Sequence, residues 1–139
     1  MKLLKQAARG FTLIEVMVVI VILAILAAIV VPEVMNRPDQ AKIVKAHQDI
    51  LAIQNAMDLY KLDNGFYPST EQGIDALVKA PTTDPKPTNW QPGGYLRVLP
   101  QDPWGHTYHY LSPGQHGAID IFTYGANNQP GGTGINAEI

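Results

Sequence analysis

The sequence predicts an α+β fold in which a long amino-terminal helix packs its second half on a small three-stranded antiparallel sheet. Three observations predict this fold. An apolar stretch with a single charge occupies residues 11–31, and it is unbroken over residues 16–31. A segment with helical spacing of apolar residues follows. The last third of the chain then holds short strand candidates separated by turn sequences.

Length and composition restrict the classes of protein that this chain can join. The 139 residues suffice for one small domain. The sequence has no cysteine, which excludes a disulfide scaffold, a thiol nucleophile and a zinc finger. The net charge of −2 excludes a nucleic-acid binder that relies on bulk positive charge. We therefore expect no nucleic-acid partner.

Residues 11–31 are predicted to span a membrane. As a helix, this stretch is roughly 32 Å long at about 1.5 Å per residue, and a bilayer core is about 30 Å thick. The first ten residues hold three basic residues and no acid, and the next positive charge is Arg37. The positive-inside rule then places residues 1–10 in the cytoplasm and residues 32–139 across the membrane.

Two simpler interpretations of the apolar stretch stay open at this point. One is a cleaved secretory signal, whose apolar region is usually about 7–15 residues and ends at a small-residue cleavage site. This run is longer, and Pro32 and Glu33 follow it directly. The other is a plain signal anchor that is never cut.

The junction from Arg9 to Glu15 (RGFTLIE) favours a third interpretation. A basic leader ends in Gly10, Phe11 opens the apolar run, and a carboxylate stands at the fifth residue of that run. This pattern resembles the amino terminus of type IV pilins and of type II secretion pseudopilins. The resemblance implies that a prepilin peptidase cuts between Gly10 and Phe11 and methylates the new amino group of Phe11.

Glu15 needs its own account, because a carboxylate in a spanning helix costs a few kcal/mol unless it is partnered. It lies only about 6 Å from the start of the run, so it can snorkel to the interface as a simple anchor residue. The alternative that we favour pairs Glu15 of one subunit with the new Phe11 amine of its neighbour. That pairing would set the axial register of an assembly.

Beyond the membrane, the sequence predicts an amphipathic helix over 33–63, with bends or openings at Pro32 and Pro38. Gly65 is a natural left-handed cap after it. A capping box at Ser69 and Gln72 opens a short helix over 70–79, and a proline-rich loop over 80–94 follows. A meander over 95–124 comes next. Its three strand candidates cover 95–99, 108–111 and 119–124.

The part of the chain beyond the membrane segment closely resembles the major pseudopilins of the type II secretion system. The resemblance rests on Tyr60–Asn64 (YKLDN), Tyr67–Thr70 (YPST) and Asp102–Gly105 (DPWG). It implies a type IV pilin-like lollipop with a cleaved leader (1–10), a filament-core helix (11–31), a periplasmic head (32–124) and a C-terminal loop (125–139).

The resemblance also implies a function and a set of partners. Such subunits sit in the bacterial inner membrane as single-pass proteins and polymerise with copies of themselves into a periplasmic fibre. Their partners are minor pseudopilins, the prepilin peptidase, an inner-membrane platform protein, an assembly ATPase and inner-membrane lipid. Growth of the fibre drives exoproteins through the outer membrane. The alternatives are a type IV pilin for adhesion, motility or DNA uptake, and a membrane-anchored periplasmic enzyme, for which no catalytic motif is present.

Two hypotheses for a metal site arise in the head, one for calcium and one for zinc. The family binds a structural calcium ion in its C-terminal loop, and alignment puts Asn127, Asn136 and Glu138 where the family prefers Asp. Calcium favours six to eight oxygens, including several carboxylates, so the loss of two charges should weaken binding. A glycine-rich loop without metal is the alternative. The four histidines, at 47, 106, 109 and 116, show no metal-site spacing, so we expect ordinary surface and turn residues.

Overall fold

The computed structural model describes residues 9–139, except for the side chains of residues 33–36. It divides into two compact units, one ending at Pro38 and the other covering Asp39–Ile139. We call residues 11–31 the stem and residues 39–139 the head. Most of the predicted leader, residues 1–8, lies outside the described part of the chain.

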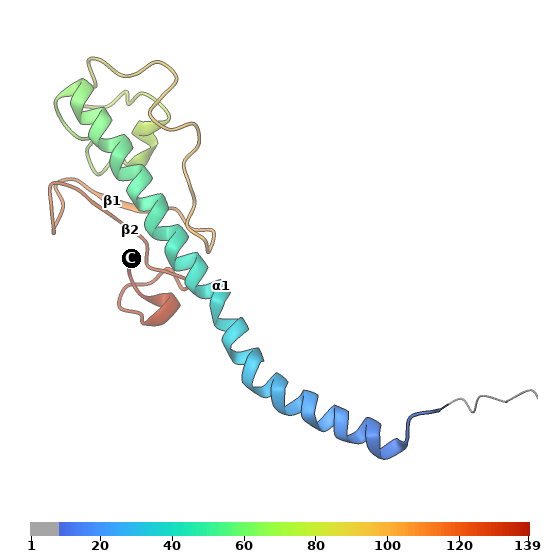
Figure 1. Ribbon diagram of the computed structural model, residues 1–139. Coiled ribbons are helices and arrows are strands. Elements are labelled where there is room, and N and C mark those ends of the chain that lie inside the picture. The colour runs from blue at the N-terminus through green and yellow to red at the C-terminus, as the bar shows by residue number, and fades with distance from the viewer. Residues whose placement is uncertain (1–8) are drawn as a thin grey trace, which may run out of the picture. The chain divides into compact units, whose positions relative to one another are not determined.

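One helix, α1, runs from Leu13 to Asn64 (Figure 1). Pro32 and Pro38 both lie inside it, so of the two expected effects, a bend or an opening, the opening does not occur. Each proline removes one backbone donor, but the residues around it keep their helical conformation. The predicted end is confirmed: Gly65 has φ +84°, and its N–H donates to the Lys61 carbonyl at 2.7 Å.

The core of the head forms on one face of α1. Ile53, Met57 and Tyr60 are fully buried there. They pack against side chains from the rest of the head, including Leu77, Tyr108, Tyr110 and Ile121. The predicted stripe of apolar helix residues is therefore the core face, as its spacing of three and four residues indicated.

The sheet of the head has two strands where the sequence predicted three. β1 (His109–Leu111) pairs antiparallel with β2 (Asp120–Phe122) (Figure 1). The predicted strand at 95–99 is wrong, because the N–H groups of Tyr95 and Leu96 both donate to the Leu77 carbonyl (2.7 and 3.2 Å). The Tyr95 ring packs on Tyr60 instead of standing in a sheet.

The helix predicted over 70–79 is also wrong in extent. The structure has only a four-residue 3-10 helix, η1 (Ile74–Leu77). The capping box itself is present: Ser69 N–H donates to Gln72 Oε1 (3.0 Å), and Gln72 N–H donates to Ser69 Oγ (3.2 Å). Gly73 has φ +62°, which no residue inside a right-handed helix adopts, so the capped turn and η1 stay separate.

The loop over 80–94 is irregular, as predicted, and is held by side chains. Gln72 Nε2 donates to the Thr83 and Pro85 carbonyls (2.7 and 3.0 Å). Trp90 Nε1 donates to the Ala76 carbonyl (2.9 Å). After β2, the C-terminal loop contains a second 3-10 turn, η2 (Gly134–Asn136).

Candidate processing and assembly site

The predicted cleavage point lies just before the first turn of α1. Gly10 and Phe11 have no helical structure, and both are exposed, Phe11 to 88%. A methyl group placed on Gly10 would meet nothing within 4 Å. The peptide bond between these residues is therefore reachable without unwinding α1.

Thr12 and Glu15 form a capping box at the start of α1. Thr12 N–H donates to Glu15 Oε2 at 3.0 Å, and Glu15 N–H donates to Thr12 Oγ1 at 3.3 Å. These reciprocal bonds satisfy two of the donors that a helix start leaves without a partner. Sequence analysis singled out Glu15 but missed Thr12, although T-x-x-E before an apolar run is the pattern that signals such a box.

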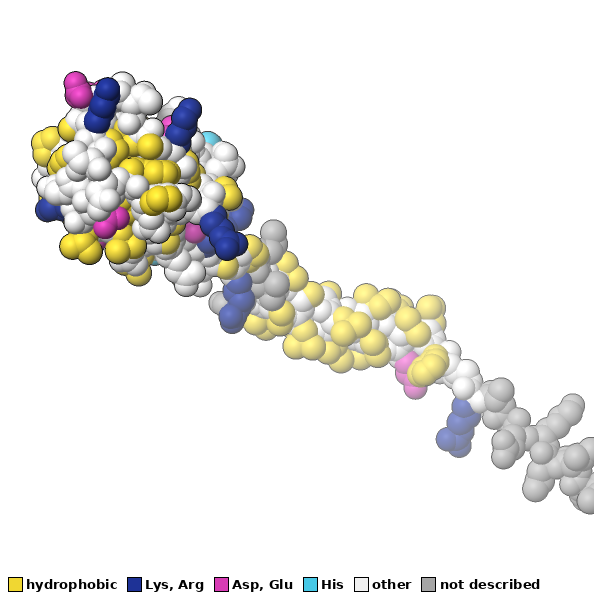
Figure 2. Space-filling model, turned by 90° about the horizontal axis from the view of Figure 1, so that it is seen from above, with side chains coloured by type: hydrophobic (Ala, Val, Ile, Leu, Met, Phe, Trp, Pro, Cys, Tyr) yellow, Lys and Arg dark blue, Asp and Glu magenta, His cyan; other side chains and the backbone are white. Residues whose placement is uncertain are grey.

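The stem buries none of its large apolar side chains. From Phe11 to Val31 each of them is exposed, the least so being Val16 at 44%. The most apolar 18-residue window of α1 has a mean hydropathy of 3.3, so this helix is long and apolar enough to cross a membrane. Figure 2 shows hydrophobic side chains along the visible face of the amino-terminal part of α1.

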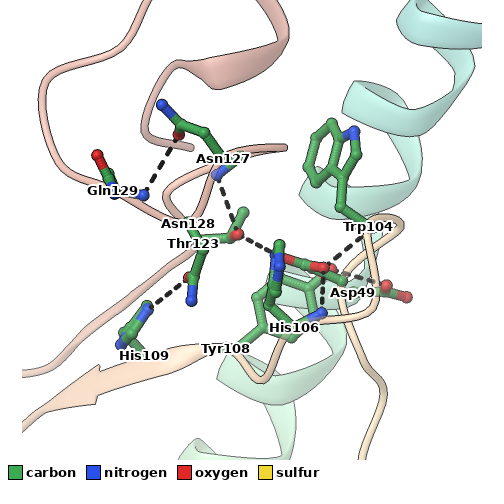
Figure 3. A network of polar contacts seen from close by, with 11 residues as sticks. Asp49, Trp104, His106, Tyr108, His109, Thr123, Asn127, Asn128 and Gln129 are labelled. Atoms are coloured by element: carbon green, nitrogen blue, oxygen red, sulfur yellow. Dashed lines mark hydrogen bonds and ion pairs between the residues drawn. The ribbon is translucent and has the colours of Figure 1, made fainter.

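A polar network centred on Asp102 lies inside the head (Figure 3). Asp102 Oδ1 accepts the N–H groups of Trp104 (3.0 Å) and His106 (2.7 Å). Its Oδ2 accepts the hydroxyl of Thr123 (2.6 Å), which is fully buried. The DPWG motif is thus a turn closed by its own aspartate, which is a structural role.

Tyr108 joins the same region to α1, because its hydroxyl donates to Asp49 Oδ2 at 2.8 Å (Figure 3). Burial raises the pKa of Tyr108, and the hydrogen bond to the Asp49 carboxylate raises it further. Burial also raises the pKa of Tyr110, to about 12. Both phenols are therefore neutral at physiological pH and act as donors.

The residues singled out for metals do not converge. Within residues 9–139, no three His, Asp or Glu side chains gather where they could hold a metal ion. His106 approaches Asp102 and His116 approaches Asp120, while His109 contacts Asn128.

The donor set of the C-terminal loop does not fit a calcium ion. Of Asn127, Asn136 and Glu138, only Glu138 carries a charge. The Asn127 side-chain oxygen already accepts the Gln129 N–H at 3.3 Å. Calcium sites usually draw on several carboxylates, and this loop offers one.

An uncovered apolar helix with a leader-type junction, joined to a small α+β head, defines a class: the pilin-like proteins with a processed amino terminus. Two family models match the chain, and both agree with this class. The prokaryotic N-terminal methylation motif covers residues 5–31. Protein G of the type II secretion system covers residues 33–139.

Relatives and a solved structure narrow this class. The chain is 59% identical over 135 residues to the type II secretion system core protein G of Pseudomonas aeruginosa, covering 97% of this chain and 95% of that protein. It is 55% identical to the Vibrio cholerae core protein G, covering 99% and 92%. The crystal structure of the major pseudopilin of enterohaemorrhagic Escherichia coli matches with a TM-score of 0.68 and 45% identity, covering 76% of this chain and 90% of that one.

The chain therefore belongs to the family of type II secretion system protein G, the major pseudopilins. This family is structural and not enzymatic, which removes the enzyme alternative. Membership also favours the secretion family over ordinary type IV pilins, because the match covers the head and not only the amino terminus. It implies partners in the secretion machinery and processing by a prepilin peptidase.

Proposed function

We propose that this chain is cut between Gly10 and Phe11, methylated on Phe11, and polymerised into a periplasmic fibre whose growth drives exoproteins through the outer membrane. Residues 1–10 are the leader and lie in the cytoplasm before the cut. The stem anchors the subunit in the inner membrane and later forms the core of the fibre. The observation that carries the proposal is the exposed apolar stem, with one carboxylate beside the predicted cut.

Hydrophobicity alone does not explain why a stem would leave the bilayer. Lipid tails are as apolar as the Ile, Leu and Val side chains of the stem, so exchanging lipid for neighbouring stems gains little. A polar contact inside hydrocarbon is different, because an unpartnered carboxylate there costs a few kcal/mol. The preference for the assembly therefore depends on Glu15 and on the amine that cleavage creates.

The capping box leaves Glu15 free to serve this second purpose. Only Oε2 is bonded to Thr12 in the structure, and an ionised carboxylate offers about four acceptor positions. The methylated amine of Phe11 in a neighbouring subunit can bind the remaining positions without breaking the cap. Glu15 then does two things: it starts its own helix and sets the register of the next subunit.

The heads and the remaining partners complete the proposal. Minor pseudopilins join the same fibre, while a platform protein and an ATPase at the inner membrane supply the work. The subunit needs no catalytic group for this role, since its contribution is mechanical. Residues 32–139, which include the head and its C-terminal loop at 125–139, lie in the periplasm.

Intact mass tests the processing step. Protein from a host with a prepilin peptidase should lose residues 1–10 and gain one methyl group. An uncut chain, or a cut near Ala28 or after Pro32, would overturn the assignment of Gly10 and Phe11.

Charge-neutral variants test the assembly step. Glu15→Gln keeps an acceptor for the Thr12 cap but removes the charge, so we expect normal processing and a loss of fibres in cross-linking and electron microscopy. Glu71→Gln makes the same change at an exposed position in the head and should assemble like the parent chain. Wild-type fibre yield from Glu15→Gln, or from Glu15→Val, would contradict the pairing.

A further inference from the structure

The C-terminal loop, residues 125–139, is closed by its own backbone. Thr123 at the end of β2 pairs with Ile139 in both directions, N–H to carbonyl, at 3.0 and 2.9 Å. Within the loop, Ala126 N–H donates to the Ile135 carbonyl at 2.8 Å. The first pair of bonds closes the loop at its base, and the third bond joins its two sides.

Two glycines let the loop fold tightly against its own carbonyl groups. A methyl group on Gly125, which has φ +76°, would lie 2.4 Å from the Ile135 carbonyl oxygen. A methyl group on Gly132 would lie 1.9 Å from the Asn136 carbonyl oxygen. The carbonyls of the loop therefore face its own backbone at these points.

A buried carboxylate holds the base of the loop. Asp102 Oδ2 accepts the Thr123 hydroxyl (2.6 Å), and Thr123 Oγ1 in turn accepts the Gly125 N–H (3.2 Å). Figure 3 shows Thr123 between the DPWG turn and the C-terminal loop. A charge-assisted bond of this kind is stronger than a neutral one. Asp102 thus supplies, from another turn, the negative group that orders the loop.

We propose that this loop is ordered by a protein-only latch, Asp102–Thr123–Gly125, and does not depend on calcium. The proposal departs from what the family resemblance implies. It rests on the latch and on the donor set: Asn127 and Asn136 carry no charge, and the Asn127 oxygen accepts a hydrogen bond from Gln129 N–H within the loop. We attribute the independence from calcium to the uncharged side chains of these two asparagines.

Hydrogen exchange on the full chain in detergent micelles tests the first part. The backbone amides of Ala126 and Ile139 report directly on loop closure, because Ala126 donates to Ile135 within the loop and Ile139 donates to Thr123 at its base. Exchange should be equally slow with 1 mM CaCl2 and with 1 mM EGTA, and the melting temperature should not move. Faster exchange or a lower melting temperature on chelation would overturn the proposal.

A hydroxyl deletion tests the latch. Thr123→Val removes both bonds of the hydroxyl and should speed exchange at Ala126 and Ile139 about tenfold, in calcium and in EGTA alike. Thr123→Ser keeps the hydroxyl and should exchange slowly, which separates the latch from simple packing. Thr133→Val is the matched control, since the exposed Thr133 makes no side-chain cap bond. Unchanged loop exchange in Thr123→Val would refute the latch.

A gain-of-binding variant tests the role of the side chains of Asn127 and Asn136, even if Thr123→Val fails to fold. The double substitution Asn127→Asp with Asn136→Asp adds two carboxylates to the loop that contains Glu138. Its loop should exchange more slowly, and it should melt higher, in calcium than in EGTA. A double variant that ignores calcium would overturn the assignment to Asn127 and Asn136.

Discussion

The stem and the head differ in the exposure of their apolar side chains. Every large apolar side chain of the stem is at least 44% exposed, whereas Ile53, Met57 and Tyr60 in the head are fully buried. Both segments belong to α1, so local helix formation does not distinguish them. The difference is that the head segment packs its stripe on its own chain, while the stem requires lipid or other stems.

This contrast assigns the two segments different kinds of stability. The head stabilises itself through its core and through polar contacts such as those of Asp102. The stem has no partner within the described chain, and its only polar anchor is the Thr12–Glu15 box at its start. Substitutions in the head should therefore change its melting, and substitutions in the stem should change assembly.

The largest effect should come from a charge in the stem. Ile22→Lys costs about 3 kcal/mol at the centre of a spanning helix. The rest of the apolar run outweighs that cost, so the chain should still fractionate with membranes. Fibres should be lost, because packed stems would enclose an unpaired ammonium group. Cross-linking checks assembly, with Ile22→Leu as the control, and an assembling Ile22→Lys would break the contrast.

The next effect concerns the core of the head. Ile53→Ala should lower the free energy of unfolding by about 2 to 5 kcal/mol, because Ile53 is fully buried. Leu51→Ala, two residues away on the same helix at 60% exposure, should change it by less than about 0.5 kcal/mol. Denaturant unfolding in micelles measures both. Equal costs at the two positions would show that the core does not lie on this face.

A smaller effect is expected where the stem begins. Thr12→Ala removes the acceptor for the Glu15 N–H, which should cost about 1 kcal/mol locally. The Glu15 amide should then exchange roughly fivefold faster in micelles. Thr12→Ser keeps the cap and should exchange like the parent chain. If Thr12→Ala left this amide protected, the box would not be what starts α1.

Local pattern predicted α1 and the stem well, because long periodic and apolar segments carry a strong signal. The roles of Gly10, Phe11 and Glu15 in processing and assembly stay predictions. The prediction failed where a distant group forms hydrogen bonds with the backbone. The Leu77 carbonyl accepts the N–H groups of residues 95 and 96, and no local feature of residues 95–99 indicates these bonds. At 70–79, the predicted helix runs through Gly73, whose positive φ ends the capped turn.

The contacts of the candidate site and of the head also divide into those that the sequence indicates and those that it does not. The Thr12–Glu15 box was readable from T-x-x-E, but the two roles predicted for Glu15, an interfacial anchor and an assembly contact, did not include capping. The Asp102–Thr123 contact was not readable, since it joins residues 21 apart, one in the DPWG turn and the other just after β2. Such contacts depend on the tertiary fold and leave no spacing in the sequence.

The smallest effect is a dependence on alkaline pH that should belong to the head alone. Tyr110 is buried, and its hydroxyl donates to the Pro68 carbonyl at 2.8 Å. Burial raises the pKa of Tyr110 to about 12, from about 10 for an exposed tyrosine. The folded head holds this proton after the unfolded chain has lost it. The contribution is therefore complete below pH 10 and is lost as the pH rises toward 12.

Thermal melting in micelles measures this loss, which should reach about 1 kcal/mol between pH 10 and pH 11 for Tyr110. Tyr110→Phe should melt lower at pH 8, because the bond to Pro68 is gone, but should lose less stability on going to pH 11. Part of the loss should remain, since burial also raises the pKa of Tyr108. The stem contains no tyrosine, so membrane fractionation should not follow the same curve. Parallel pH curves for the parent chain and Tyr110→Phe would show that this phenol is not the group responsible.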